Sequence, residues 1–406
     1  MDRALTFQDA NDEFVARAAS GARSVAALVS LLPGIYPADV VASLARLGLS
    51  LPLGSSERLL RLPGPTPHPI DQDWRLHPSS TTYLTQAVSE LRPSAVALLG
   101  CPSLATSMCT VAPRVALADA NEAWLPYLAK APVDHIWGDV ALSSRQWGSC
   151  FDVVVADPPW YPAEFAAFLT AAAAIVRPHG TVFVSWPGAG TRPGLAEEWE
   201  ALVADATRNG LTLVRVERGA LQYATPFFEA RSLQAAGLPV FNSWRRADLV
   251  TFRSLGSAEG VAVSRPRREE RWDVVRWRHL DLRVRRFPAV PTVVDPRLHA
   301  LVAGDVLPSV SRRDPRRAAA AVWTSANRVF RCLRPDLLLA IAQALKFRER
   351  QAAPGDLAAT RVAEVVGRQL SHSEEDWVRD AEQQLITLEE TECAEYSALH
   401  EDIAAP

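Results

Sequence analysis

Lysine, methionine and closely spaced cysteines are scarce in this chain of 406 residues. Only two of the 43 basic residues are lysines, and only two residues are methionines. The five cysteines are scattered without paired spacing, which argues against disulfides and against a zinc knuckle. The sequence therefore predicts free thiols and no metal site. The dominance of arginine over lysine favours a bacterium with a GC-rich genome as the source.

Long apolar runs are also absent. No stretch of about 18 consecutive apolar residues occurs, and the first residues lack a basic segment followed by an apolar core. We therefore expect no membrane span or membrane contact, no secretory leader and a cytoplasmic location. A net charge of -3 excludes a dominant basic field. The hydrophobic content of 48% is ample for the cores of two to three domains.

One apolar run followed by two prolines is the most informative segment. Residues 151–156 are rich in valine, which suits a strand of a parallel sheet that is buried on both faces. The run ends in Asp157-Pro158-Pro159-Trp160, where the prolines cannot pair in a sheet and hold the backbone extended. Ligands of open α/β sheets bind beyond the carboxyl ends of the strands, so this ending points into the predicted cleft. Taken alone, it also fits a strand followed by a stiff turn.

The chemistry of this ending suits an amino group. The Asp157 carboxylate and the Pro158 carbonyl would accept hydrogen bonds from such a group, because neither serves a sheet ladder. The Trp160 ring would stack on a flat acceptor such as a base. We therefore predict that Asp157, Pro158, Pro159 and Trp160 form the catalytic segment.

Three further segments predict a nucleotide-like cofactor. An apolar run breaks at Gly100-Cys101-Pro102-Ser103, a turn of small residues that would cradle the cofactor. Asp119 ends the next run about 20 residues later, the offset of a carboxylate that holds ribose hydroxyls. Asp139 ends a third run and would meet the adenine amino group. Each residue alone also fits ordinary turn chemistry.

The pattern Gly-x-Gly-x-x-Gly is absent, so a dinucleotide site is not supported. S-adenosyl-L-methionine has no pyrophosphate and does not require that pattern.

These segments together resemble the N6-adenine methyltransferase-like family, which includes lysine methyltransferases of elongation factor 1A and a ribosomal RNA adenine methyltransferase. The resemblance spans about residues 71–253. It rests on Asp73-Trp74-Arg75-Leu76, the turn from Gly100 to Leu104, the segment from Phe151 to Trp160, and the segment from Trp244 to Val250. The Pro-Ser turn is a trait of that family, whereas Tyr or Phe is commoner than Trp at position 160.

The resemblance implies a class I methyltransferase fold. This is an α/β architecture with a seven-stranded Rossmann-like sheet and a reversed edge strand. It also implies S-adenosyl-L-methionine as the cofactor and an amino group as the acceptor.

We expect direct in-line transfer of a methyl group, in which the enzyme supplies alignment and a dry pocket. Adenine N6 in nucleic acid is the preferred acceptor, because Trp160 offers a large stacking surface for an unstacked base. A protein lysine is an alternative, since a desolvated pocket would lower its pKa. A catalytically silent methyltransferase fold that serves as a binding or scaffold module is the other alternative. The predicted substrate-binding residues are Tyr161, Trp186, Phe227 and Phe228.

The sequence divides into five parts. They are a small helical domain (1–50), a proline-rich linker (51–71), the methyltransferase domain (72–256), a basic strand-containing extension (257–310) and a helical C-terminal domain (311–406). The final helix is expected to begin at a capping box, Ser371 to Glu374. Residues 374–402 hold eleven acids and one arginine. Such an acidic face predicts a solvated helix or a contact for a basic protein partner.

Overall fold

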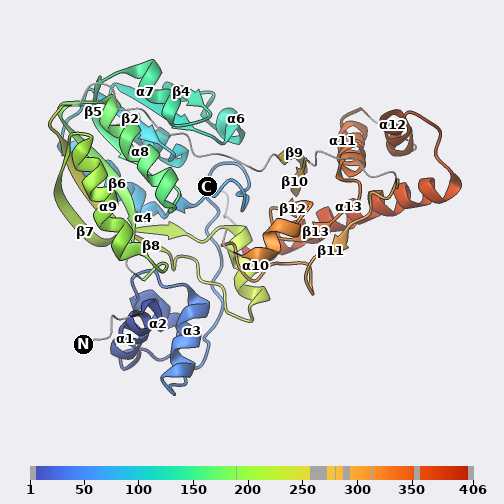
Figure 1. Ribbon diagram of the computed structural model, residues 1–406, viewed down its shortest axis with the longest axis horizontal. Coiled ribbons are helices and arrows are strands. Elements are labelled where there is room, and N and C mark those ends of the chain that lie inside the picture. The colour runs from blue at the N-terminus through green and yellow to red at the C-terminus, as the bar shows by residue number, and fades with distance from the viewer. Residues whose placement is uncertain are drawn as a thin grey trace, which may run out of the picture.

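The computed structural model describes residues 6–188, 190–256, 272–278, 280–286, 293–311, 314–351 and 357–400. Figure 1 shows three regions: a group of helices near the N-terminus, a large sheet flanked by helices, and a C-terminal module at the far side. Residues 257–271, which belong to the predicted basic extension, lie outside the described residues. Within the described ranges, no helix combines the length and the apolar composition needed to cross a membrane.

The central region is a sheet in the order β1-β7-β8-β6-β5-β2-β3-β4. Its strands are β1 (Arg75–Leu76), β2 (Ala95–Leu99), β3 (Arg114–Asp119), β4 (Val133–Trp137), β5 (Phe151–Ala156), β6 (Val176–Pro187), β7 (Leu211–Ala224) and β8 (Arg246–Ser254). The strands from β2 to β6 pair in parallel, whereas β8 is antiparallel to both β6 and β7. The reversed strand therefore lies inside the sheet and not at its edge, and the short β1 adds an eighth strand.

Helices cover both faces of this sheet. They are α4 (Pro78–Glu90), α5 (Ala105–Met108), α6 (Leu125–Leu128), α7 (Ala141–Trp147), α8 (Pro162–Ile175), α9 (Leu195–Arg208) and α10 (Phe227–Ala235), with short 3-10 turns η1 (Pro102–Leu104) and η2 (Glu122–Trp124). Successive residues of β5 contribute to two cores. Val154 packs with the core that includes α8 and α9, and Val153 and Val155 pack with the core that includes α4 and α5. Burial on both faces explains why this strand is a continuous apolar run.

Three helices precede the sheet: α1 (Phe7–Ala19), α2 (Val25–Leu31) and α3 (Pro37–Arg46). Thr6 and Asp9 form a capping box at the start of α1, and Pro37 occupies the first turn of α3. The apolar side chains of these helices share a core with Leu233, Phe241 and Trp244. The N-terminal helices therefore pack against the segment that connects β7 to β8.

The C-terminal module contains a second sheet in the order β11-β13-β12-β10-β9. Its elements are β9 (Trp272–Trp277), β10 (Leu280–Arg285), β11 (His299–Ala300), η3 (Pro315–Ala319), β12 (Val322–Thr324), β13 (Val329–Arg331), α11 (Pro335–Gln351), α12 (Leu357–Val366) and α13 (His372–Leu399). The boundary drawn at residue 310 falls inside this sheet, because β10 pairs with β12. Strands of two or three residues are too short to leave a periodic pattern in a sequence.

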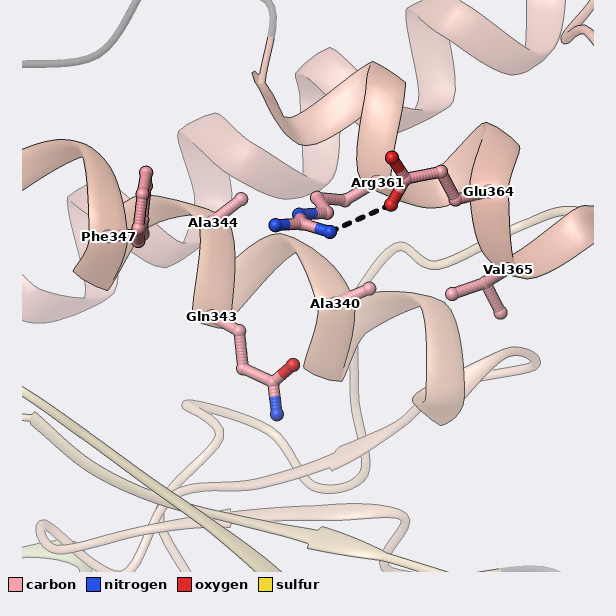
Figure 2. Close-up of a pocket in the computed structure, with 7 residues that line it drawn as sticks. All are labelled: Ala340, Gln343, Ala344, Phe347, Arg361, Glu364 and Val365. Atoms are coloured by element: carbon pink, nitrogen blue, oxygen red, sulfur yellow. Dashed lines mark hydrogen bonds and ion pairs between the residues drawn. The ribbon is translucent and has the colours of Figure 1, made fainter.

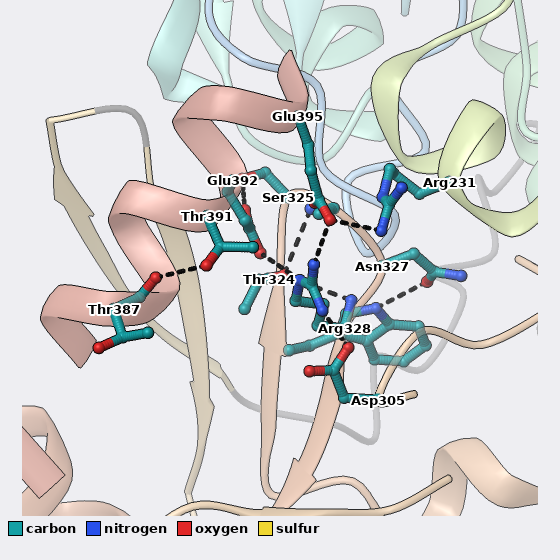
Figure 3. Close-up of polar contacts among 12 residues, drawn as sticks. Arg231, Asp305, Thr324, Ser325, Asn327, Arg328, Thr387, Thr391, Glu392 and Glu395 are labelled. Atoms are coloured by element: carbon teal, nitrogen blue, oxygen red, sulfur yellow. Dashed lines mark hydrogen bonds and ion pairs between the residues drawn. The ribbon is translucent and has the colours of Figure 1, made fainter. Parts of the chain in front are cut away.

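A network of buried charges joins the C-terminal module to the central region. Arg231 of α10 pairs with Glu395 of α13 at 2.6 Å, and Glu395 also accepts a hydrogen bond from Arg328 at 2.5 Å. Arg328 pairs in addition with Asp305. Figure 3 shows these side chains converging from α10, α13, the turn between β12 and β13, and the segment after β11 that carries Asp305.

Many acids of α13 are paired within the chain. Glu374 pairs with Arg368, Glu382 with Arg348, and Glu395 with two arginines. The capping box at Ser371 is present as predicted from the sequence. These ion pairs give the acidic residues an intramolecular role.

A surface hollow of about 400 Å³ lies between α11 and α12. Figure 2 shows its lining, with an ion pair of 2.8 Å between Arg361 and Glu364 on one wall and Phe347 at one end. Every lining residue comes from these two helices, so the hollow contains none of the predicted site residues.

Candidate active site

Asp157 lies directly after β5, at the edge of the sheet where the parallel strands end. Its backbone N–H donates to the carbonyl of Leu99 at 2.9 Å, which extends the pairing of β5 with β2 by one residue. Its Oδ1 accepts a hydrogen bond of 2.6 Å from the hydroxyl of Tyr223, near the end of β7. Ser185 of β6 hydrogen-bonds to the same hydroxyl. Side chains from three strands thus meet at one carboxylate.

The Asp157 carboxylate is surrounded by protein atoms, although the residue as a whole keeps some contact with solvent. Burial raises the pKa of this carboxyl to about 6, because the charged form loses water. Hydrogen bonds from Tyr223 and Ser185 and the charge of Arg245 act in the opposite direction. At neutral pH the group is therefore ionised and accepts hydrogen bonds.

Trp160 is 7% exposed and its ring is already in contact with protein. The ring of Tyr223 packs edge-on against it, with 5.6 Å between the two ring centroids. The guanidinium carbon of Arg245 lies 3.9 Å from the Trp160 centroid and 4.1 Å from that of Trp74. Arg245 is therefore held between two indole rings, and one face of Trp160 carries a cation.

The backbone around Trp160 is also fixed. Nε of Arg192 donates to the Trp160 carbonyl at 3.1 Å, and Arg192 in turn pairs with Glu198 at the start of α9. The N–H of Tyr161 donates to the Pro159 carbonyl at 2.7 Å, and α8 begins at the next residue. The predicted catalytic segment is thus a tight turn between β5 and α8.

The turn predicted to cradle the cofactor packs directly against Asp157. Gly100 has a φ of +70°, and a Cβ there would lie 2.7 Å from Cε1 of Phe168 and 2.9 Å from the Asp157 carbonyl. Only glycine fits this position without displacing its neighbours. Cys101 is buried and its Sγ donates to the Val155 carbonyl at 3.6 Å. Pro102 and Ser103 follow in η1.

The two acids predicted to hold the nucleoside lie along the same edge of the sheet. Asp119 ends β3, and its Oδ1 accepts from the N–H of Asn121 at 2.7 Å. Asp139 follows β4, and its Oδ1 accepts from the N–H of Ala141 at 2.9 Å. Gly100, Asp119 and Asp139 thus follow three adjacent strands in order. A close-fitting glycine turn with two acids beside it fits S-adenosyl-L-methionine, whose ribose and adenine present hydroxyl and amino donors.

Trp186 has a different surrounding from the one predicted. Its side chain is fully buried, with ring centroids 4.4 Å from Phe165 and 4.2 Å from Trp199. Adjacent residues of a strand face opposite sides, and Ser185 is the one that reaches Tyr223. The predicted contact of Trp186 with an acceptor gains no support from this placement.

The two predicted phenylalanines lie at the start of α10 and are also buried. Phe227 packs against Tyr396 of α13 at 5.2 Å, and Phe228 packs against Trp74 at 5.6 Å. Phe228 therefore supports the indole that holds Arg245, whereas Phe227 faces the C-terminal helix. Neither ring reaches Asp157 through a contact of its own.

Arg245 and Glu229 were not predicted as site residues. The guanidinium of Arg245 makes no hydrogen bond or ion pair with any residue in the described ranges. Glu229 in the first turn of α10 is fully buried, and neither of its carboxylate oxygens has a hydrogen-bond partner among the described residues. Burial raises the pKa of Glu229 to about 8, against the opposing charge of Arg245. The sequence signal for Glu229 is its place beside two aromatic residues in a segment interrupted by Pro226, which the sequence suggested as a lining of the acceptor pocket.

No protein-family model and no curated protein matches this sequence. Among solved structures, a branched-chain polyamine synthase mutein from Thermus thermophilus resembles it with a TM-score of 0.50 and 17% identity, over 63% of this chain and 89% of that chain. TrmN from Thermus thermophilus follows with a TM-score of 0.28 and 16% identity, over 42% of this chain and 48% of that chain.

A magnesium protoporphyrin IX methyltransferase from Synechocystis PCC 6803 has a TM-score of 0.30 and 14% identity, over 43% of this chain and 78% of that chain. The predicted fold class is confirmed by the strand order and by the likeness to the polyamine synthase. The chain has the Rossmann-like α/β fold of class I methyltransferases.

Proposed function

We propose that this chain is an S-adenosyl-L-methionine-dependent N-methyltransferase that acts on an amino group. The observation that carries the proposal is the Asp157 carboxylate at the end of β5, held by Tyr223 and beside the glycine turn at Gly100. The cofactor supplies an electrophilic methyl group on a sulfonium. The residues of this chain supply alignment, which accounts for most of the rate in such a direct transfer.

Asp157 orients the acceptor. Because its pKa is about 6, the carboxylate is ionised at neutral pH and accepts a hydrogen bond from the amino group. The Pro158 carbonyl accepts a second one in this proposal. Tyr223 and Ser185 hold the carboxylate in one orientation.

Adenine N6 in nucleic acid and a protein lysine are the two acceptors of the proposal. A flipped adenine that stacks on the face of Trp160 now covered by Arg245 would require that arginine to move. An aliphatic amine needs no stacking face and would enter beside the guanidinium. The adenine acceptor therefore predicts a displacement of Arg245 on binding, and the lysine acceptor does not.

Aminopropyl transfer is a second candidate. The likeness to the polyamine synthase covers 89% of that chain, and that protein was crystallised with N4-aminopropylspermidine and 5'-methylthioadenosine. An amine held by Asp157 would then attack a carbon of the aminopropyl chain in place of the methyl carbon. The cation at Arg245 disfavours a polyamine acceptor, because a polyamine carries several like charges.

The test compares two labelled donors. We expect transfer from methyl-labelled S-adenosyl-L-methionine onto DNA, RNA or protein extracts, and none from aminopropyl-labelled decarboxylated donor onto spermidine. Asp157→Ala should abolish transfer and leave the fold intact. The reverse donor preference would establish the second candidate. A protein that fails to bind S-adenosyl-L-methionine in calorimetry, with Asp119→Ala indistinguishable from wild type, would be a silent binding or scaffold module.

A further inference from the structure

Arg245 is held as a rigid, planar group beside the candidate active site. Its backbone carbonyl accepts a hydrogen bond of 3.0 Å from Tyr223, the residue that also holds Asp157. Its guanidinium lies between Trp74 and Trp160, at about 4 Å from each ring. A guanidinium stacked in this way has lost its rotational freedom before any ligand arrives.

The two indoles are themselves supported. Trp74 packs edge-on against Phe228 at 5.6 Å and against Trp244 at 6.2 Å. Trp160 packs against Tyr223 and has its carbonyl bound by Arg192. The orientation of the guanidinium plane is therefore set by surrounding packing.

The hydrogen-bonding capacity of Arg245 is unused. A guanidinium carries five N–H donors and stays charged in proteins, so unpaired donors are not removed by loss of a proton. Stacking satisfies its two faces, but its donors lie in the plane of the group and make no bond to any described residue. The residue as a whole is half-buried.

No acid of the described chain forms an ion pair with this cation. Among the acids whose charge acts on Arg245, Glu229 has the largest effect. Burial raises the pKa of Glu229, however, and favours its protonated form at neutral pH. Asp157 also acts on Arg245, but its Oδ1 is engaged by Tyr223. Burial raises the pKa of Tyr223, so its hydroxyl is uncharged at this pH. No described acid thus pairs directly with the positive charge of Arg245, and its unpaired donors suit an anion.

We infer that Arg245 is an anion-binding residue of this site, which takes a planar oxyanion in bidentate fashion through the in-plane edge of its guanidinium. The inference rests on the proposed function and deepens it. Carboxylates and phosphates match the spacing of the guanidinium fork. One source of such a group is the amino-acid carboxylate of the donor, and the other is a phosphate on the acceptor.

The first experiment separates these sources by calorimetry. Wild-type protein is titrated with S-adenosylhomocysteine and with its decarboxylated analogue, which differ only in the carboxylate. A charge-assisted bidentate contact predicts that the carboxylate form binds about ten- to hundredfold more tightly. Arg245→Ala should bring the two affinities within about threefold of each other. Arg245→Lys keeps the charge without the fork and should give an intermediate ratio.

Arg246→Ala is the matched control, because the neighbouring arginine donates to the carbonyl of Ser30 instead. It should keep the wild-type ratio. An unchanged affinity of Arg245→Ala for the decarboxylated analogue shows that the site remains folded.

The second experiment addresses the acceptor. Protein saturated with S-adenosylhomocysteine is titrated with adenosine 5'-monophosphate and with adenosine. If the oxyanion belongs to the acceptor, wild type prefers the monophosphate by about tenfold or more and Arg245→Ala loses that preference. The inference is overturned if wild type prefers neither the carboxylate form of the donor nor the monophosphate. It is also overturned if the preference that wild type shows survives in Arg245→Ala. Wild-type protein that binds neither nucleoside of the first experiment refutes the proposed function itself, which is a separate outcome.

Discussion

The hydroxyl of Tyr223 donates a hydrogen bond of 2.6 Å to Oδ1 of Asp157, although 66 positions separate the two residues. The bond links the end of β7 to the end of β5 across two intervening strands, and Ser185 of β6 fills the gap between them. The carboxylate that would orient the acceptor is thus held by a residue that has no place in the Asp-Pro-Pro-Trp motif.

Tyr223→Phe should therefore impair catalysis more than binding of the donor. Loss of one hydrogen bond to a charged group costs roughly 1.5–3 kcal/mol, which corresponds to about a tenfold to hundredfold fall in kcat. The affinity for S-adenosylhomocysteine should stay within about threefold of wild type. An equal loss of donor affinity would assign Tyr223 to the cofactor site.

The titration of Asp157 predicts how activity depends on pH. Because its pKa is about 6, the carboxylate accepts a proton as the pH falls through that value and loses its acceptor role. The value of kcat should fall about tenfold per unit below pH 6. Asp157→Asn should lack this acid limb and retain little activity at any pH. A profile in wild type that is flat between pH 5 and 7, within about twofold, would contradict the assigned role.

Glu229 predicts a dependence of stability on pH. Its folded-state pKa of about 8 lies above the ordinary glutamate value, so the folded chain holds this proton more tightly than the unfolded chain. The resulting stability is fully present below about pH 4.3 and is lost as the pH rises towards 8.

Glu229→Gln removes this titration. The free energy of unfolding of both proteins is measured with denaturant at pH 4.5 and at pH 8.5. Between these values, the difference between variant and wild type should shift by roughly 2–4 kcal/mol in favour of the variant. Comparing the two proteins at each pH cancels the contributions of Asp71, Asp157 and Glu392, whose pKa values burial also raises. A difference that stays constant across this range would show that Glu229 keeps an ordinary pKa.

Gly100→Ala should damage the cofactor turn. The added methyl group would meet Phe168 at 2.7 Å, and the φ of +70° is itself costly for alanine. We expect a loss of roughly 1–3 kcal/mol in unfolding free energy and at least tenfold weaker binding of S-adenosylhomocysteine. Gly148→Ala is a suitable control, because it also has a positive φ but meets nothing within 4 Å. Similar donor affinity in both variants would argue against a cofactor at Gly100.

Glu395→Gln should loosen the attachment of the C-terminal module. It removes one charge from pairs with Arg231 and Arg328 that are largely buried, and Arg328 keeps its pair with Asp305. We expect roughly 1–3 kcal/mol of destabilisation and faster proteolysis between the two regions. Glu390→Gln, on the exposed side of the same helix, should change stability by less than about 0.5 kcal/mol. Equal effects of both substitutions would show that the ion pairs of Glu395 have no specific role in attaching the C-terminal module.

The sequence predicted those parts of the molecule whose signals are local. Residues such as Gly100, Asp119 and Asp157 are visible because each ends an apolar run at the same edge of a parallel sheet. The order of strands brings these separate endings together at one site. The resemblance to known methyltransferases implied seven strands and a reversed edge strand, whereas the sheet has eight strands and the reversed strand β8 lies inside it.

Contacts that depend on register were not predictable. Ser185 and Trp186 are neighbours in β6, and only the pairing of β6 with β5 and β8 decides which of them faces Tyr223. Trp186 is the predicted substrate-binding residue, whereas Ser185 is the one that hydrogen-bonds to Tyr223. Arg245 was likewise visible in the sequence, yet its position between Trp74 and Trp160 joins segments that are far apart in the chain.

The packing of Phe227 against Tyr396 has a consequence for biosynthesis. Helix α10 lies near the middle of the chain, but its partners in α13 are among the last described residues to leave the ribosome. The central sheet has all of its strands by residue 254, long before that helix exists. During synthesis, Phe227 of α10 therefore lacks its packing partner until Tyr396 has been added to the chain.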